Sequence, residues 1–496
     1  MCWLRTVVIS FIVGTVVGGR DFPPDFKFGA ATAAYQVEGA WNVSDKSPSI
    51  WDSYIRRYPE RIIDGSSGDV ACDSYNQWRK DVEIASNLGL HFYRFSIAWT
   101  RLMPSGFPNT VSEDGKKFYN DLIDALLEKG IEPVVTLYHW DLPQSLQDLG
   151  GWTNPLVSDW FADYARIAFS LFGDRVKTWI TLNEPIIFCE IVYNTAMHAP
   201  GILSAGVGNY LCNKHAMLAH AKAWRIYDEE FRPKYNGKVS LSNQILWLEP
   251  ENENDVEITE TSRQLMVGMF SHPIFSKEGG WPPVIEKIIA EKSKKEGLSK
   301  SRLPPFTQEE IDFVKGTYDF FALNYYTSRT VKKAKEGDRI GPWPMNGASD
   351  LDIHLTVRPE WKHAATSWFY IYPEGLRRQL AWLKEHYGDI EILITENGYA
   401  SYDISEDDPD RVQYYKEHLE QVLLAIEDGV KVSGYTAWTM IDNFEWSDGY
   451  RSKFGLYKID FEDPLRKRSP RASAHYYSSV VKSHSLDVDN KFTDEL

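Results

Sequence analysis

The sequence has few cysteines and lacks the spacings of a metal site. Its four cysteines are Cys2, Cys72, Cys189 and Cys212, and the last three can form at most one disulfide bond. A large core, rather than cross-links, must therefore stabilise the fold. The 12 histidines are scattered and show no His-x-x-x-His or Cys/His pattern of the kind that binds zinc. We predict no metal ion and no other cofactor.

Positive charge is also in short supply. The sequence has 54 Lys and Arg residues and 70 Asp and Glu residues, so its formal net charge is −16. Such a chain does not attract phosphate backbones, so we expect no nucleic acid partner. The features described below indicate a small-molecule substrate instead, and they leave the oligomeric state open.

Long apolar runs are absent beyond the N-terminus. Residues 6–17 are apolar but too few to span a bilayer, Arg5 precedes them, and small residues follow at 17–19. This pattern predicts a signal peptide over residues 1–19 and one mature domain over residues 20–496, without a membrane segment. A signal anchor is the less favoured alternative. The predicted location is extracellular.

Two further features matter if the chain is secreted. Asn42 begins an Asn-Val-Ser triplet, the acceptor pattern for N-linked glycans, and we predict a glycan there. Residues 493–496 read Thr-Asp-Glu-Leu and differ from the Lys-Asp-Glu-Leu retention signal only at the first position. They indicate either a frayed acidic tail or retention in the endoplasmic reticulum.

Strand-like and helix-like segments alternate from about residue 25 onward. We predict eight strands, at residues 28–35, 91–97, 133–139, 177–184, 238–243, 320–326, 391–396 and 434–439. The main helices are predicted at residues 69–90, 112–130, 156–173, 210–231, 255–270, 373–388 and 408–429. This order indicates an α/β fold, a single (β/α)8 TIM barrel with extended βα loops, among them a long loop at residues 328–369. A doubly wound sheet is disfavoured because no Gly-x-Gly-x-x-Gly follows the first strand.

Two of the predicted strands end in a glutamate. Glu184 precedes Pro185, which cannot continue a sheet, and Glu396 precedes an Asn-Gly turn. The C-terminal ends of barrel strands are where this architecture does chemistry. A single glutamate at a strand end is usually solvated or caps a helix, but two in one chain indicate a two-carboxylate glycosidase. The 18 Trp agree with this, since indole faces suit the apolar surfaces of sugar rings, although most are expected in the core.

Seven stretches near predicted strand ends carry a more specific pattern. They are residues 28–39 (Phe-Gly-Ala-Ala-Thr-Ala-Ala-Tyr-Gln-Val-Glu-Gly), 93–101 (Tyr-Arg-Phe-Ser-Ile-Ala-Trp-Thr-Arg), 137–141 (Leu-Tyr-His-Trp-Asp), 181–185 (Thr-Leu-Asn-Glu-Pro), 324–326 (Asn-Tyr-Tyr), 394–398 (Ile-Thr-Glu-Asn-Gly) and 438–446 (Trp-Thr-Met-Ile-Asp-Asn-Phe-Glu-Trp). Together and in this order they resemble glycoside hydrolase family 1, the β-glucosidase family, and above all its secreted animal members. The resemblance covers essentially the whole mature chain and implies an O-glycosyl hydrolase.

The resemblance implies a role for each matching residue. Glu184 would be the acid/base, and Glu396 the nucleophile held by Arg94 and Tyr326, so that a covalent glycosyl-enzyme forms and the anomeric configuration is retained. The residues implied to bind the sugar are Gln36, His139, Asn183, Asn324, Trp438, Glu445 and Trp446. Glu445 also implies an unphosphorylated β-D-glycoside, because a carboxylate repels the phosphate that phospho-sugar relatives accept.

The chain departs from the family pattern at positions that look like the leaving-group side. They are Ile186, Ile187 and Phe188, which follow the Asn-Glu-Pro motif, and Met269 and Phe270, where the family often has Trp-Phe. These departures leave the aglycone open, but not the cleavage.

We therefore expect a retaining β-glucosidase that removes the non-reducing terminal β-D-glucosyl residue of O-glucosides. A myrosinase-like thioglucosidase that cleaves glucosinolates is the alternative. Plant myrosinases lack the acid/base glutamate, so the presence of Glu184 favours O-glucosides. A catalytically inactive, klotho-like binding protein is least favoured, because both glutamates are present.

Overall fold

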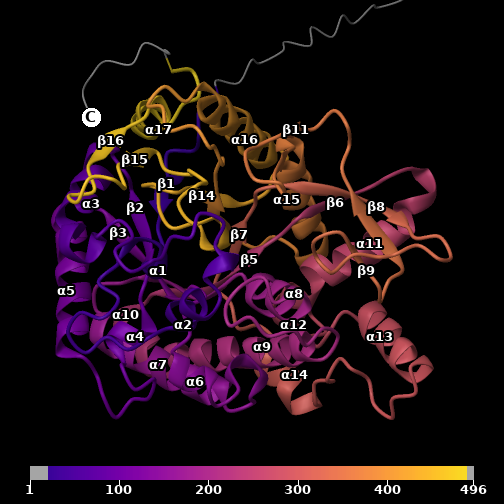
Figure 1. The fold of residues 1–496 in the computed structure, drawn as a ribbon. Helices are drawn as coiled ribbons and strands as arrows, with labels where there is room; N and C mark the ends of the chain where they lie inside the picture. Colours follow the sequence, from indigo (N-terminus) through magenta and orange to yellow (C-terminus); the bar gives the residue numbers. More distant parts are fainter. Residues whose placement is uncertain (1–19, 489–496) are drawn as a thin grey trace, which may run out of the picture.

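The structure, a computed structural model, describes residues 20–488, so the predicted signal peptide and the C-terminal tetrapeptide lie outside it. Eight parallel strands close into a barrel: β1 (Lys27–Ala31), β2 (Phe92–Ser96), β3 (Glu132–Tyr138), β4 (Thr178–Asn183), β5 (Lys238–Gln244), β7 (Phe321–Asn324), β13 (Ile392–Asn397) and β14 (Val432–Trp438). Around the barrel they follow the order β1-β14-β13-β7-β5-β4-β3-β2 (Figure 1). At least one helix follows each strand, so the predicted (β/α)8 barrel is confirmed.

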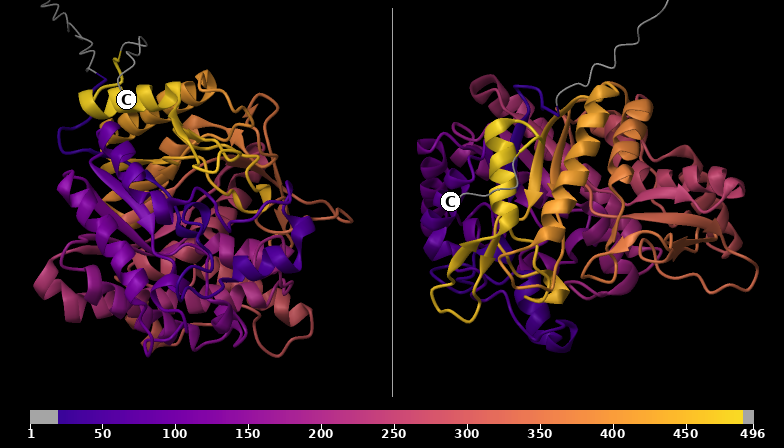
Figure 2. Two further views of the ribbon diagram at one scale, coloured as in Figure 1. Left: turned by 60° about the vertical axis from the view of Figure 1, so that its left-hand side comes forward. Right: turned by 90° about the horizontal axis from the view of Figure 1, so that it is seen from above.

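Helices surround the barrel (Figures 1 and 2). The long ones are α3 (Ser74–Asn87), α5 (Glu113–Glu128), α7 (Val157–Phe172), α9 (Gly208–Ile226), α13 (Pro283–Lys295), α15 (Pro373–Tyr387), α16 (Pro409–Glu427) and α17 (Ala472–Ser483). The shorter ones are α1 (Ala34–Val37), α2 (Ile50–Arg57), α4 (Trp99–Leu102), α6 (Gln144–Gln147), α8 (Val192–Thr195), α10 (Arg232–Tyr235), α11 (Val256–Arg263), α12 (Met269–Phe275) and α14 (Gln308–Val314). No helix within residues 20–488 is long and apolar enough to cross a membrane.

The sequence predicted several helix bounds well because their caps are local. At the start of α5 the hydroxyl of Ser112 accepts the Gly115 N–H at 3.0 Å. The face of α5 that carries Phe118, Leu122 and Leu126 is buried against the barrel, as its helical spacing predicts.

Other bounds were predicted wrongly. The first strand ends at Ala31 rather than at residue 35, because the Ala34 N–H donates to the Ser96 hydroxyl at 2.6 Å and α1 begins there. Helix α3 begins five residues later than predicted, because Asp73 takes a left-handed conformation with φ 55°. Helix α17, the eighth outer helix of the barrel, was not predicted at all.

The predicted loop at residues 328–369 is partly a sheet. Strands β8 (Ser328–Lys333), β9 (Gly347–Ala348) and β10 (Ile353–Thr356) join β6 (Trp247–Pro250) in the order β6-β8-β10-β9, at the side of the barrel (Figure 2). Two small hairpins complete the set: β11 (Lys362–His363) with β12 (Tyr370–Ile371), and β15 (Tyr457–Ile459) with β16 (Arg468–Pro470). The backbone groups of the 328–369 segment are thus hydrogen-bonded in part by strands that pair with one another and with β6.

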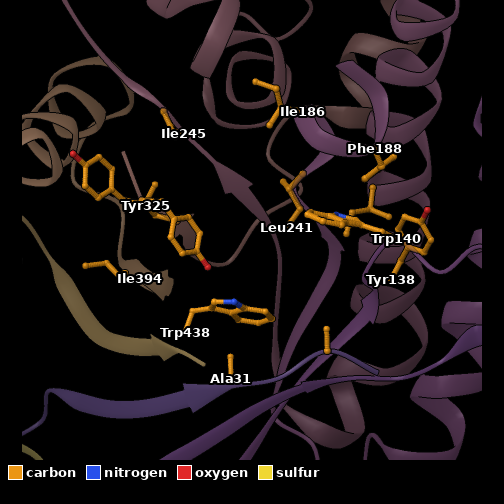
Figure 3. Packing of buried hydrophobic residues seen from close by; sticks show 14 of the residues in the cluster. Ala31, Tyr138, Trp140, Ile186, Phe188, Leu241, Ile245, Tyr325, Ile394 and Trp438 are labelled. Atoms are coloured by element: carbon orange, nitrogen blue, oxygen red, sulfur yellow. The ribbon is translucent and has the colours of Figure 1, made fainter. Parts of the chain in front are cut away.

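One disulfide and a large aromatic core stabilise the region around the strand tips. Cys189 bonds to Cys212 of α9, and Cys72 is buried as a free thiol. Trp438 ends β14 beside Ala31, its register partner in β1 (Figure 3). The tips of β14 and β1 therefore close one side of the space in which the predicted glutamates lie.

Candidate active site

A pocket of about 620 Å³ opens at the C-terminal ends of the barrel strands. Seven of the residues predicted for the site line it: His139, Glu184, Tyr326, Glu396, Trp438, Glu445 and Trp446. The other four, Gln36, Arg94, Asn183 and Asn324, are fully buried and hydrogen-bond to one another or to neighbouring residues. The structure thus brings together side chains from strands that lie far apart in the sequence.

Glu396, near the end of β13, is held by a cation and a phenol. Arg94 Nη1 donates to its Oε1 at 2.6 Å, and the Tyr326 hydroxyl donates to its Oε2 at 2.7 Å. Burial raises the pKa of Glu396, while the charge of Arg94 and these two hydrogen bonds oppose that rise. Both carboxylate oxygens therefore have donors that stabilise the ionised form.

Glu184, one residue beyond the end of β4, pairs with no cation among residues 20–488. It takes φ +52°, an uncommon backbone for a residue other than glycine, and its Oε1 accepts the Asn324 amide at 2.6 Å. Burial and the nearby charge of Glu396 raise the pKa of Glu184 well above its ordinary value. When the two carboxyl groups share one proton, the proton therefore resides on Glu184.

Asn183 connects the two carboxyl groups to His139. Its Oδ1 accepts from Arg94 at 2.7 Å and from Asn324 at 3.1 Å, so its Nδ2 must be the donor in the 3.1 Å contact with His139 Nε2. His139 then carries its proton on Nδ1. Burial lowers the pKa of His139 well below its ordinary value, so the ring is neutral. It presents one N–H donor, on Nδ1.

Three polar atoms around the inner end of the pocket have no partner among the described residues. They are His139 Nδ1, Glu445 Oε1 and Gln36 Oε1, the last on a side chain whose amide N–H groups already bind Asn443 and Phe444. Indole rings adjoin them: the His139 ring stacks on Trp438 with the ring centres 5.7 Å apart and an angle of 17°. Buried polar groups without partners are unusual, and a polyhydroxylated ring above the indoles would satisfy them.

The sequence model of glycosyl hydrolase family 1 matches residues 19–486. This chain belongs to glycosyl hydrolase family 1. It is 46% identical to Myrosinase 1 of Brevicoryne brassicae over 93% of this chain and 98% of that one, and 41% identical to the human cytosolic β-glucosidase over 94% and 99%.

Solved structures agree with this membership. The aphid myrosinase superimposes with a TM-score of 0.89 at 46% identity, over 94% of this chain and 100% of that one. The rice Os3BGlu6 β-glucosidase reaches 0.85 at 37% identity, over 92% and 98%. The chain is therefore a glycoside hydrolase, and the pocket at its strand ends is the candidate active site.

The outer part of the candidate active site of this glycosidase was predicted only in part. Ile187 lines the pocket as expected, but Ile186 and Phe188 are buried in the core. The prediction for Met269 and Phe270 was wrong, because both are buried and neither lines the pocket. Residues of the outer wall that sequence reasoning missed include Trp140, Ile191, Arg329 and Trp368. For Ile191 a signal existed, since it follows Ile187 by one helical turn.

Arg329, which lines the pocket, differs from the other buried arginines in its hydrogen-bond partners. Four other buried arginines each pair with a carboxylate; they are Arg94, Arg101, Arg411 and Arg471. Arg329 instead donates to the Thr327 hydroxyl and to the carbonyl groups of Ser328 and Trp368, and no carboxylate among residues 20–488 pairs with it. Burial lowers the pKa of Arg329 to about 10, so it remains charged at neutral pH.

Proposed function

We propose that this family 1 enzyme is a retaining β-glucosidase that removes the non-reducing terminal β-D-glucosyl residue of O-glucosides. The observation that carries the proposal is the difference between its two carboxyl groups. Glu396 has a cationic partner that favours the ionised form, and Glu184 has an environment that favours the protonated form. A nucleophile and a general acid are the two states that double displacement requires.

In the first step, the Glu396 carboxylate attacks the anomeric carbon and forms an ester bond to the sugar. The bond from that carbon to the leaving oxygen breaks, and Glu184 gives its proton to this oxygen. Arg94 and Tyr326 position Glu396 for the attack. The products are the free aglycone alcohol, a glucosyl-enzyme and an ionised Glu184.

In the second step, Glu184 takes a proton from water, and the resulting oxygen nucleophile attacks the same anomeric carbon. The ester bond breaks, and Glu396 leaves as a carboxylate. Two displacements at one carbon retain its configuration, and they require carboxyl groups about 5–5.5 Å apart. The raised pKa of Glu184 suits its role as an acid in the first step. Once the ester removes the negative charge of Glu396, the pKa of Glu184 falls, which suits its role as a base in the second step.

The proposed sugar contacts use the unpartnered atoms of the inner pocket. His139 Nδ1, Gln36 Oε1 and Glu445 Oε1 bind sugar hydroxyls, Trp446 borders them, and Trp438 packs under the ring. Asn183, which Asn324 orients, binds the 2-hydroxyl through its remaining amide N–H. This last contact strengthens as positive charge develops on the sugar in the transition state.

The alternative is a thioglucosidase that cleaves glucosinolates, and two observations favour keeping it. One is the 46% identity to an enzyme named as a myrosinase. The other is Arg329, because an unpaired guanidinium beside the pocket attracts an anionic leaving group, and glucosinolates carry a sulfate. Glu184 argues for O-glucosides, since a thiolate leaves without a proton donor.

A substrate panel on the purified protein tests the proposal. We expect turnover of 4-nitrophenyl β-D-glucoside and of cellobiose, with the β-anomer of glucose as the first product. Cleavage of a glucosinolate alone would select the alternative. If neither the O-glucosides nor the glucosinolate were cleaved, only the hypothesis of a catalytically inactive binding protein would remain.

We also propose that the chain is secreted and carries a glycan at Asn42, which is exposed in the segment between α1 and α2. Expression of the full chain in a eukaryotic secretory cell should yield protein in the medium that begins near residue 20. Treatment with an N-glycosidase should reduce its mass, and Asn42→Gln should abolish that change.

A further inference from the structure

A buried carboxylate behind the outer wall takes no part in the chemistry proposed above. Glu190 lies in the π-helix η3 (Ile186–Ile191), directly after Pro185, and is 2% exposed. No cation among residues 20–488 pairs with it. Three amides hold it instead: Asn194 and Asn209 donate to its Oε2 at 2.8 Å each, and Asn213 donates to its Oε1 at 2.5 Å.

In the Glu190 cluster (Glu190, Asn194, Asn209 and Asn213), three amide donors require an acceptor with two oxygens at position 190, which a carboxylate provides. An ionised Glu only accepts hydrogen bonds and has room for about four, whereas Gln offers one acceptor oxygen and adds a donor that faces other donors. Burial without a counter-ion raises the pKa of Glu190, and hydrogen bonds from the three amides oppose that rise.

The cluster joins segments of the outer wall to helix α9, which does not line the pocket. Asn209 and Asn213 lie in α9, and the Cys189–Cys212 disulfide makes a second link between η3 and the same helix. Asn194 of α8 also donates to the carbonyl of Trp343 at 3.2 Å, and the next two residues after Trp343 line the pocket. Glu190 is thus the point at which η3, α9 and the 343–345 segment meet.

Helix η3 continues directly from the proposed acid/base. The Ile187 N–H donates to the Glu184 carbonyl at 2.9 Å, and Glu184 has the left-handed backbone described above. Ile187 and Ile191 of η3 line the pocket, whereas Glu190 does not. A shift of η3 would therefore move the Glu184 carboxyl group relative to the leaving oxygen.

We propose that Glu190 is a positioning residue for the acid/base: the Glu190 cluster fixes η3 and thereby holds Glu184 within reach of the leaving-group oxygen. The inference rests on the proposed function, because it assigns the positioning to the step in which Glu184 gives up its proton. It does not involve Glu396, whose contacts come from β2 and from the residues that follow β7.

The test uses a series of aryl β-D-glucosides whose phenols differ in acidity. An acidic phenol such as 2,4-dinitrophenol leaves without protonation, whereas phenol itself needs the acid. For Glu190→Gln we expect kcat/KM on the 2,4-dinitrophenyl glucoside within about threefold of the parent, and on the phenyl glucoside a loss of about 10- to 100-fold, because small displacements of a proton donor are costly.

Two further variants separate positioning from stability. Asn194→Ala removes a partly exposed member of the cluster and should show the same dependence on the leaving group with a smaller loss; it decides the test if Glu190→Gln does not fold. Asp81→Asn breaks a buried pair with Arg468, 2.7 Å long, in helix α3 away from the pocket. It should lower Tm without any dependence on the leaving group.

A uniform loss across the series, or no loss in either cluster variant, would overturn the role of Glu190. A parent enzyme that cleaves none of the glucosides would instead refute the proposed function. The two failures are therefore distinguishable.

Discussion

The inner and outer ends of the pocket are built in different ways. At the inner end, polar side chains from several strands bond to one another: Arg94 of β2 contacts Thr136 of β3, Asn183 of β4 and Glu396 of β13. At the outer end the wall comes from η3 and from the 328–369 excursion. It is largely apolar, and its buried guanidinium, Arg329, has no carboxylate partner within residues 20–488.

This difference separates two tasks. The closed barrel fixes strand tips relative to one another, so the groups that act on the sugar are held rigidly. The outer residues lie on connections that can change without disturbing the barrel, so they can adapt to the leaving group. Substitution of the nucleophile at the inner end should therefore reduce every reaction, whereas substitutions at the outer end should change the preference among substrates.

The largest effect is expected for the inner nucleophile. Glu396→Gln should lower kcat for 4-nitrophenyl β-D-glucoside by about 10⁴-fold or more, because no covalent intermediate can form. Glu391→Gln is the matched control: it lies just before the opposite end of the same strand, paired with Lys238 on the surface, and should keep full activity. A Glu396→Gln enzyme as fast as the parent would refute the assignment of Glu396 as the nucleophile.

The acid/base should show a loss that depends on the substrate. For Glu184→Gln we expect kcat/KM on phenyl β-D-glucoside to fall by about 10²- to 10⁴-fold, the usual contribution of a general acid, and far less on the 2,4-dinitrophenyl glucoside. Equal losses on both substrates would contradict the role of Glu184 as proton donor.

Tyr326→Phe should shift the pH profile more than the rate. The Tyr326 hydroxyl stabilises the Glu396 carboxylate, so its removal raises the pKa of Glu396. Because the nucleophile must be ionised, the acidic limb of kcat/KM should move to higher pH, with a loss of about tenfold at neutral pH. An acidic limb that stays in place, or moves to lower pH, would show that the hydrogen bond does not tune Glu396.

The narrowest effect is expected at the outer end, where only charged substrates should be affected. Arg329→Gln should weaken kcat/KM for an aryl glucoside with a carboxylate or sulfate on its aglycone by about 5- to 20-fold, and leave the neutral analogue unchanged, as for loss of one charge-assisted hydrogen bond. Equal effects on the charged and neutral substrates would show that Arg329 supports the wall without selecting an anion.

The same division explains what the sequence could predict. The position of Glu184 and Glu396 in one pocket was predicted because strand patterns are local and because the barrel brings every strand end to one face. The placement of Met269 and Phe270 failed because a linear pattern does not say which face of α12 meets the core. The unpaired state of Arg329 depends on which carboxylates lie near it in space, and no local pattern records that.

Short and irregular elements account for the remaining differences in the fold. Helix α17 was missed because it follows a hairpin of three-residue strands, where the alternation of strands and helices is interrupted. The β6-β8-β10-β9 sheet pairs segments that lie about 80 residues apart, since Trp247 is the register partner of Ser328. Such pairing is decided by tertiary contacts rather than by local propensity.

Trapping of the intermediate tests most directly whether Glu396 and Glu184 act as a nucleophile and acid pair on one sugar carbon. Incubation with 2,4-dinitrophenyl 2-deoxy-2-fluoro-β-D-glucoside, followed by mass spectrometry of peptic fragments, should place one fluoroglucosyl group on Glu396. A label on another residue, or turnover of ordinary glucosides that releases the α-anomer first with no label, would contradict the double displacement proposed here.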